Sequence, residues 1–355
     1  MKKLVYPLFI IGLFSCSSGF LKYDQKKDIF KNEEFEKKVL IKEAPVENLG
    51  STPETKEAPI VENKHKGPAH AVISEAEKKL IAENKKTKKK KGKVAETVAS
   101  APKERQPDIE DSEGFGVERR PLKDPFRVGE KVVHTVSYFG TSAGVLTFSV
   151  GPFVEVNNRK SYNFKVDIKS SRLFSNFYSA QDKVETYVDH EDLVPHVFKL
   201  DIKESGQLKQ AQSYFDQKAL KASYWENKYT EKNGHEEKKQ NWEILPYSQN
   251  AFSSVFYMRV FKWNVGQEYA FRVSDDEKNV VFKGKALEKV KLETDAGKFD
   301  AIKIKAEIVA HGALTQTGDL MIWLSDDEHH YILRIEAKIK IGTLVSEITS
   351  LTPGS

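Results

Sequence analysis

The chain has 355 residues, with 57 Lys or Arg against 52 Asp or Glu, so its formal net charge is only +5. Such a small excess gives no electrostatic ground for nucleic-acid binding, and a single cysteine excludes an internal disulfide framework. The length allows about two domains before segments of biased composition are subtracted.

The chain opens with the features of an export signal. Lys2 and Lys3 precede an apolar run over residues 4–14, long enough for a secretory signal but short of the roughly 20 residues of a spanning helix. The sequence LFSC at 13–16 resembles the lipobox of bacterial lipoproteins, and the only cysteine falls where lipid attachment needs a thiol. An ordinary signal peptide or a short buried helix is the alternative. We predict a lipoprotein signal peptide over 1–15 and lipid attachment at Cys16.

The resemblance to lipoproteins also implies a location in the cell. Members of that class carry acyl chains that hold them firmly to a membrane. Ser17 follows the cysteine, where an aspartate would signal retention in the inner membrane. The outer membrane, on its periplasmic side, is therefore favoured.

Residues 16–121 have the composition of a disordered, charged linker. They are rich in Lys, Glu, Pro and Ala and poor in aromatic residues, so they bury too little apolar surface to offset the entropy of ordering them. A coil of about 105 residues has an end-to-end distance of roughly 60 Å. Such a linker would let a folded domain stand well away from its membrane.

A run of lysines within this linker is a candidate polyanion-binding site. Its members are Lys85, Lys86, Lys88, Lys89, Lys90, Lys91 and Lys93. Outside the cytosol, the anions available to it are lipid headgroups, lipopolysaccharide phosphates and cell-wall polymers. Alternatively, the lysines only solvate and extend the linker.

Residues 122–355 form the folded part of the chain. Apolar and polar residues alternate there with the period of strands, in the segments 131–138, 145–150, 162–168, 183–188, 196–202, 212–215, 269–273, 299–308, 320–324, 332–339 and 343–348. Many short strands predict a mainly β, antiparallel domain. A barrel-like or strongly curved sheet would leave few exposed edges.

One interval breaks the strand pattern. Apolar residues recur at helical spacing over 252–260, and Ser248 or Asn250 can cap the start. We predict one substantial helix at about 248–263, packed on the sheet or plugging it. Arg259 lies on its apolar side and needs a buried partner or a pocket. Asp326 and Asp327 are the candidate partners, in a structural ion pair or a ligand site.

Several segments are similar to the bacterial DUF3108 family of exported proteins of unknown function. They are 126–130 with 138–140 and 143–144, the serine-to-arginine helix at 253–259, the segment 294–302, and 322–327 with Gly342 downstream. The resemblance covers residues 122–351. It implies a β-barrel-like fold and a place in the cell envelope, but no active site.

Residues of catalytic or metal-binding type form no recognisable motif. The sequence contains no phosphate loop, nucleophile elbow, HExxH or CxxC. Residues 326–330 (DDEHH) have metal-ligand types, but neighbours on a tight turn point apart, so a polar hairpin turn is the preferred interpretation. We predict no metal, no cofactor and no catalytic residue.

Two scattered sets of residues leave enzymatic alternatives open. Four scattered histidines show no triad spacing in the sequence, although a triad is formed in space and not along the chain: His134, His190, His196 and His311. Four carboxylates lie in predicted strands: Asp167, Asp182, Glu185 and Asp201. They could supply a carboxylate pair for glycoside hydrolysis, but the solvated face of a sheet is the preferred interpretation.

The sequence thus predicts a non-enzymatic binding or interaction module, lipid-anchored to the outer membrane and facing the periplasm. Its partner would be an envelope protein, a cell-wall component or a lipid, and not a nucleic acid. The alternative is a carrier or sensor of a lipid or small apolar ligand in a β-barrel cavity, and an envelope hydrolase is less favoured. A packed interior would favour the interaction module, whereas a continuous apolar cavity would favour the carrier.

Overall fold

The computed structural model describes residues 31–44, 123–310, 313–314, 320–339 and 342–355. The chain divides into one compact unit of residues 1–45 and 106–355 and a second of residues 46–105. Only the first unit contains described residues. The predicted signal peptide, Cys16, the lysine run at 85–93 and His311 lie outside them, so these interpretations stay predictions. Among the described residues, no helix is long and apolar enough to cross a membrane.

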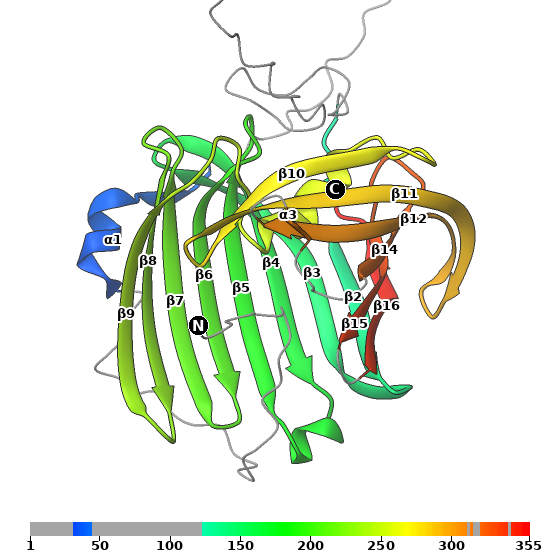
Figure 1. Cartoon of the computed structure of the whole chain (residues 1–355), viewed down its shortest axis with the longest axis horizontal. Helices are drawn as coiled ribbons and strands as arrows, with labels where there is room; N and C mark the ends of the chain where they lie inside the picture. Colours follow the sequence, from blue (N-terminus) through cyan, green and yellow to red (C-terminus); the bar gives the residue numbers. More distant parts are fainter. Residues whose placement is uncertain (1–30, 45–122, 311–312, 315–319, 340–341) are drawn as a thin grey trace, which may run out of the picture. The chain divides into compact units, whose positions relative to one another are not determined.

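Antiparallel strands make up most of this unit, as predicted (Figure 1). From residue 131 onward they are β2 (Lys131–Tyr138), β3 (Thr141–Val156), β4 (Arg159–Ser170), β5 (Ala180–Asp189), β6 (Pro195–Glu204), β7 (Gln207–Asp216), β8 (Lys221–Thr230), β9 (Gly234–Glu243), β10 (Glu268–Asp275), β11 (Lys278–Thr294), β12 (Gly297–Ala310), β13 (Ala313–Leu314), β14 (Leu320–Ser325), β15 (Ile332–Ile339) and β16 (Gly342–Thr352). The predicted mainly β fold class is confirmed.

The strands follow one another across a single sheet in the order β10-β11-β12-β14-β15-β16-β2-β3-β4-β5-β6-β7-β8-β9, with β13 beside β12. Two runs of sequential hairpins, β2–β9 and β10–β16, are therefore joined where β16 pairs with β2. Figure 1 shows β10, β11 and β12 running across the direction of β3–β9. The sheet is strongly curved.

Side chains connect β9, at one end of this order, with β10 and β11 at the other end. Trp242 Nε1 donates to Ser274 Oγ at 2.8 Å, and Asn279 Nδ2 donates to the carbonyl oxygen of Glu243 at 2.9 Å. Gln249, in the connection after β9, pairs with Val273 on the free edge of β10. The curvature thus brings the ends of the sheet together through side chains and one isolated bridge, instead of a full strand ladder.

The predicted helix at about 248–263 is much shorter in the structure. Helix α3 covers only Ser253–Tyr257, and a 3-10 turn, η3 (Met258–Val260), follows it. Asn250 Oδ1 accepts hydrogen bonds from the backbone of Phe252 (3.0 Å) and Ser253 (2.7 Å). The residues before α3 do not extend the helix because Gln249 is bound to the edge of β10.

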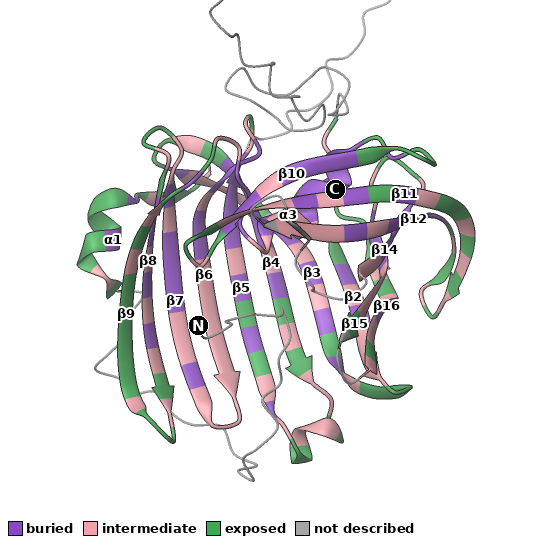
Figure 2. Ribbon diagram, viewed as in Figure 1, coloured by how far each residue is buried: buried purple, intermediate pink, exposed green. Residues whose placement is uncertain are grey.

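Helix α3 fills the apolar part of the curved sheet. Phe256 is fully buried and stacks on Phe164 of β4, with ring centroids 4.3 Å apart. Figure 2 shows buried residues gathered around α3, whereas β9 is almost wholly exposed. We call the face of the sheet that carries Phe164 the inner face and the opposite one the outer face. The core therefore lies between α3 and one part of the inner face.

A short segment near the N-terminus is folded onto the outer face. Residues 32–44, here called the strap, contain helix α1 (Glu33–Lys38) and strand β1 (Ile41–Glu43). Asn32 Oδ1 caps α1 by accepting from the backbone of Glu34 (2.9 Å), and β1 pairs with β3 at Ile41 and Val156. Phe35 packs edge-on against Trp225 of β8, with ring centroids 6.0 Å apart. The strap thus spans β3 to β8.

The prediction of a disordered linker over 16–121 is therefore wrong for residues 33–43. The average composition of the linker does not reveal this segment, which is a short capped helix followed by three apolar residues, Val39, Leu40 and Ile41. Phe35 and Val39 are 4% and 6% exposed, in a small core separate from that of α3. A short amphipathic segment of this kind gains its stability from docking, which composition alone does not reveal.

Candidate functional site

Ionisable side chains line the inner face of β5–β9, beyond the part that α3 fills. Because side chains alternate along each strand, the register places at least one such group from each strand on this face. The five that define the site are Asp182 on β5, Glu204 on β6, Lys209 on β7, Glu226 on β8 and Lys238 on β9. We call these five residues the polar wall. It is the candidate functional site.

The first part of the polar wall is a pair of carboxyl groups. Asp182 is 8% exposed and shares a hydrogen bond with Glu204, which also bonds to Tyr178. Burial and the neighbouring Glu204 raise the pKa of Asp182 to about 8, although the backbone of Lys203 donates to it. Gln207 Nε2 donates to Glu204 at 2.6 Å. At neutral pH the carboxyl group of Asp182 is therefore mainly protonated.

The raised pKa predicts how Asp182 affects stability. The unfolded chain ionises this residue above about pH 4 and the folded chain only near pH 8, so the native protein loses stability as the pH rises between them. Asp182→Asn keeps the hydrogen-bonding shape without titrating. We expect it to raise the free energy of unfolding at pH 8 by about 2 kcal/mol and to change it little at pH 4.

Urea unfolding at the two pH values measures this difference, with the exposed outer-face Asp167→Asn as the matched control. Equal pH dependence of the native chain and Asp182→Asn would show that Asp182 does not hold its proton in the folded chain.

The second part of the polar wall alternates positive and negative charges. Lys209 Nζ lies 3.1 Å from Glu226, and Tyr224 donates a hydrogen bond to the same carboxylate. Burial alone would raise the pKa of Glu226, but Lys209 and this hydrogen bond lower it. Lys238 Nζ donates to Asp276 at 3.2 Å and lies 5.7 Å from the Tyr224 ring centroid. The side chain of Glu226 is 13% exposed and that of Lys238 is 43% exposed, so the wall opens to solvent toward β9.

Arg259 forms the buried ion pair that the sequence predicts, but with a different partner. Its side chain is 1% exposed and that of Glu130 is fully buried. Nη1 and Nη2 donate to the two carboxylate oxygens at 2.6 and 3.0 Å, and Nη2 also donates to the carbonyl oxygen of His329 at 3.0 Å. The guanidinium lies over the rings of Phe126 and Tyr331. With its charge matched and its donors occupied, this arginine ties η3, directly after α3, to the segment before β2 and to the turn between β14 and β15.

The prediction that Asp326 or Asp327 pairs with Arg259 is wrong. Asp326 accepts from Lys289 Nζ at 2.6 Å, and Asp327 accepts from Ser325 Oγ and from the backbone of His329 and His330. Asp327 is thus used within the polar turn between β14 and β15, and Asp326 pairs from this turn with Lys289 of β11. Among the described residues, no group of three or more His, Cys, Asp or Glu side chains is arranged to hold a metal ion.

The described members of the two scattered sets do not gather at one site. Burial lowers the pKa of His134 to about 4, and its ring nitrogens contact Ser346 Oγ (3.0 Å) and the carbonyl oxygen of Ile332 (2.8 Å). Since that carbonyl only accepts, Nε2 carries the proton and the ring is a neutral structural link. Asp182 lies on the inner face, while the other three carboxylates share the outer face: Asp167, Glu185 and Asp201.

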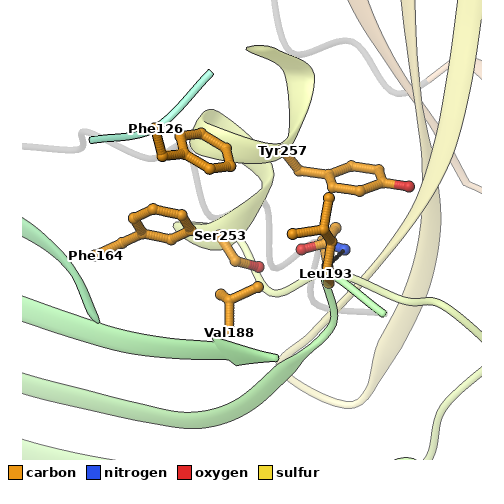
Figure 3. A pocket seen from close by; sticks show the side chains of 7 residues that line it. Phe126, Phe164, Val188, Leu193, Ser253 and Tyr257 are labelled. Atoms are coloured by element: carbon orange, nitrogen blue, oxygen red, sulfur yellow. Dashed lines mark hydrogen bonds between the residues drawn. The ribbon is translucent and has the colours of Figure 1, made fainter. Parts of the chain in front are cut away.

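The space beneath α3 is one of the two places where the carrier alternative would hold an apolar ligand, the other being the barrel interior. Figure 3 shows its lining, which comes from α3, the β-strands and their connections: Phe126, Phe164, Val188, Leu193, Gln249, Ser253 and Tyr257. These side chains leave no volume for a molecule the size of water. The rings of Phe126 and Phe164 lie 4.7 Å apart, and Gln249 Nε2 donates to the carbonyl oxygen of Leu193 at 2.7 Å. Packing therefore fills this space.

Comparison with known proteins finds one family. The family model described as "Protein of unknown function (DUF3108)" matches residues 133–349, from within β2 to within β16. Among the curated proteins, none matches the chain.

Similar solved structures come from three bacteria. A β-barrel-like protein of domain of unknown function DUF1849 from Brucella abortus shares 7% identity, with a TM-score of 0.40 over 63% of this chain and 96% of that one. A candidate exported protein with a YmcC-like fold from Bacteroides fragilis shares 9%, with a TM-score of 0.29 over 64% and 98%. A candidate lipoprotein from Parabacteroides distasonis shares 11%, with a TM-score of 0.29 over 66% and 100%.

Proposed function

Because this chain belongs to the DUF3108 family, whose function is unknown, we propose a role from its own residues: a non-enzymatic binding module of the bacterial cell envelope. A lipid on Cys16 holds it to the periplasmic face of the outer membrane. Its partner is a component of the envelope that presents charged and hydrogen-bonding groups to the polar wall.

The polar wall carries this proposal. Lys209 is paired with Glu226, and Lys238 with Asp276, on a surface that is only partly exposed, so a polar partner can exchange one ion pair for another. An apolar ligand would instead leave these charges buried without compensation, which is costly. The arrangement supports recognition of a polar partner over carriage of a lipid tail.

The carrier alternative finds no support in the space beneath α3. It requires an apolar cavity in the barrel interior or under the helix. The space beneath α3 is filled by aromatic and aliphatic side chains. We therefore retain the interaction module as the single proposed function.

Site-specific crosslinking in cells tests the proposal. A photo-crosslinking amino acid replaces Lys228, which lies next to Lys209 on the inner face, or Lys183, which is exposed on the outer face of the same sheet. We expect position 228 to trap a discrete envelope component and position 183 to give only background. The double variant Lys209→Ala and Glu226→Gln should lower the yield at position 228 by at least about tenfold, since one charge pair contributes of the order of 1.5 kcal/mol or more at a binding interface.

Unfolding curves of the double variant, taken beside those of the native chain, separate lost binding from lost structure. Background labelling at both positions, or a yield that the double variant leaves unchanged, would contradict a partner site on the polar wall.

A further inference from the structure

Three large apolar side chains are exposed at one end of the sheet. Phe139, in the turn between β2 and β3, is 76% exposed, and Leu173 and Phe177, in the connection between β4 and β5, are 63% and 74% exposed. We call these residues the apolar rim. Scattered exposed apolar residues are ordinary on a protein surface, but a cluster of them on adjacent loops marks an interaction site.

The two loops of the apolar rim are held side by side. The backbone nitrogen of Ser171 donates to the carbonyl oxygen of Ala143, and its Oγ donates to that of Ser142, both at 2.8 Å. A 3-10 turn, η2 (Phe174–Asn176), orders the longer loop, and Ser205 Oγ accepts from the backbone of Ser179 at 2.9 Å. Figure 1 shows the β4–β5 loop and the β2–β3 turn at the same end of the sheet, opposite β10. The loops that carry the three side chains are thus braced at the same end of the sheet.

Basic residues flank the apolar rim. Arg172 precedes Leu173 and is exposed, Lys169 is exposed at the end of β4, and Lys338 is exposed at the end of β15, beside the β2–β3 turn. The carboxylates nearest this end of the inner face, Asp182 and Glu204, are bonded to each other. Apolar side chains projecting from loop tips, with cations beside them, suit the boundary between anionic headgroups and acyl chains.

The strap keeps this end of the sheet within reach of the membrane to which the chain would be anchored. This step depends on the lipid proposed at Cys16. The strap fixes the chain from Asn32 onward, so about 15 residues separate it from Cys16, which extend to at most roughly 50 Å. A ten-residue strand such as β8 is about 34 Å long. A domain held this closely can rest its rim on the bilayer that carries its lipid.

We propose that the apolar rim inserts into the membrane surface, with Phe139, Leu173 and Phe177 in the headgroup boundary and the flanking cations on anionic headgroups. The lipid and the rim then hold the domain at two points. This fixes which way the sheet faces relative to the membrane.

Vesicle sedimentation tests the rim apart from the lipid. The mature chain with Cys16→Ser, which cannot be acylated, is mixed with vesicles of phosphatidylethanolamine and phosphatidylglycerol at 3:1. We expect it to bind, and the triple variant Phe139→Ser, Leu173→Ser and Phe177→Ser to lose at least tenfold in partition coefficient. The matched control, Leu245→Ser with Val265→Ser, removes apolar residues that are 46% and 54% exposed in the connections flanking α3 and should bind like the parent.

The outcomes of vesicle sedimentation and of crosslinking distinguish the rim proposal from the proposed function. Coincident unfolding curves show that the variants remain folded. No vesicle binding by the parent, or equal binding by the parent and the triple variant, overturns the rim proposal while leaving crosslinking at position 228 as the test of the proposed function. Rim binding without a crosslinked partner would overturn the interaction module alone.

Discussion

Replacing Arg259 with Met is expected to lower the free energy of unfolding by about 3–5 kcal/mol, the largest effect of any single substitution discussed for this domain. The side chains of Arg259 and Glu130 are 1% and 0% exposed, and two hydrogen bonds join them. Removing the guanidinium leaves a carboxylate in the core without water or a partner. The variant also loses the donors that bind the carbonyl oxygen of His329.

Urea unfolding of three variants isolates the burial of the pair. Lys289→Met breaks the exposed pair with Asp326 and should cost no more than about 1 kcal/mol. The double variant Arg259→Met with Glu130→Gln removes both charges and should recover part of the loss, because no ion is left unpaired in the core. A loss of less than about 1 kcal/mol for Arg259→Met alone would mean that the carboxylate finds water.

Phe35→Ala is expected to release the strap from the outer face. The ring is 4% exposed and packs on Trp225, and Phe→Ala substitutions at such sites cost about 3 kcal/mol or more. A cost of that size changes the docking equilibrium by roughly 100-fold. Since the strap packs on the sheet without forming part of its main core, the loss should be local.

Hydrogen exchange measures this release directly. Amides of residues 33–43 should exchange about 100-fold faster in Phe35→Ala, while those of β4–β8 keep their protection. Leu40→Ala is the matched control, because Leu40 belongs to the same strap but is 51% exposed. Unchanged exchange in the strap, or loss of protection throughout the sheet, would contradict local docking.

Release of the strap would change the reach of the domain. With the strap docked, only about 15 residues separate Cys16 from the folded domain. With the strap free, the connection is the linker of about 105 residues that composition suggests, with an end-to-end distance of roughly 60 Å. The strap therefore determines whether the proposed tether is short or long.

Alternation of apolar and polar residues is sufficient to predict most of the sheet. Every segment with period two lies within a strand, and the segment 131–138 coincides with β2. The pattern misses β9 because this edge strand carries charged residues on both faces, which protects it from pairing with another chain. It also misses β8, whose inner face is polar, and β11, whose second half is charged on both faces.

The candidate site was less accessible to sequence reasoning because it depends on register. Asp182 was among the carboxylates considered, but its partner Glu204 was not, since only the pairing of β5 with β6 brings them together. Glu130 lies 129 residues from Arg259 along the chain, and nothing in its local sequence marks it as buried. The sequence does indicate that Arg259, if buried, needs a carboxylate partner, but it does not indicate which carboxylate.

The order of the strands also determines when folding can finish. β2–β9 and β10–β16 each grow by adding the next strand along the chain, but the two halves join only through β16 and β2, where Thr352 pairs with Lys131. Contacts between residues about 200 apart form slowly, because the entropy of closing the loop is lost before the contacts stabilise it. A chain released from its N-terminus keeps the edge of β2 unpaired until its last strand arrives. During that interval a chaperone could bind this edge, which the mature protein covers.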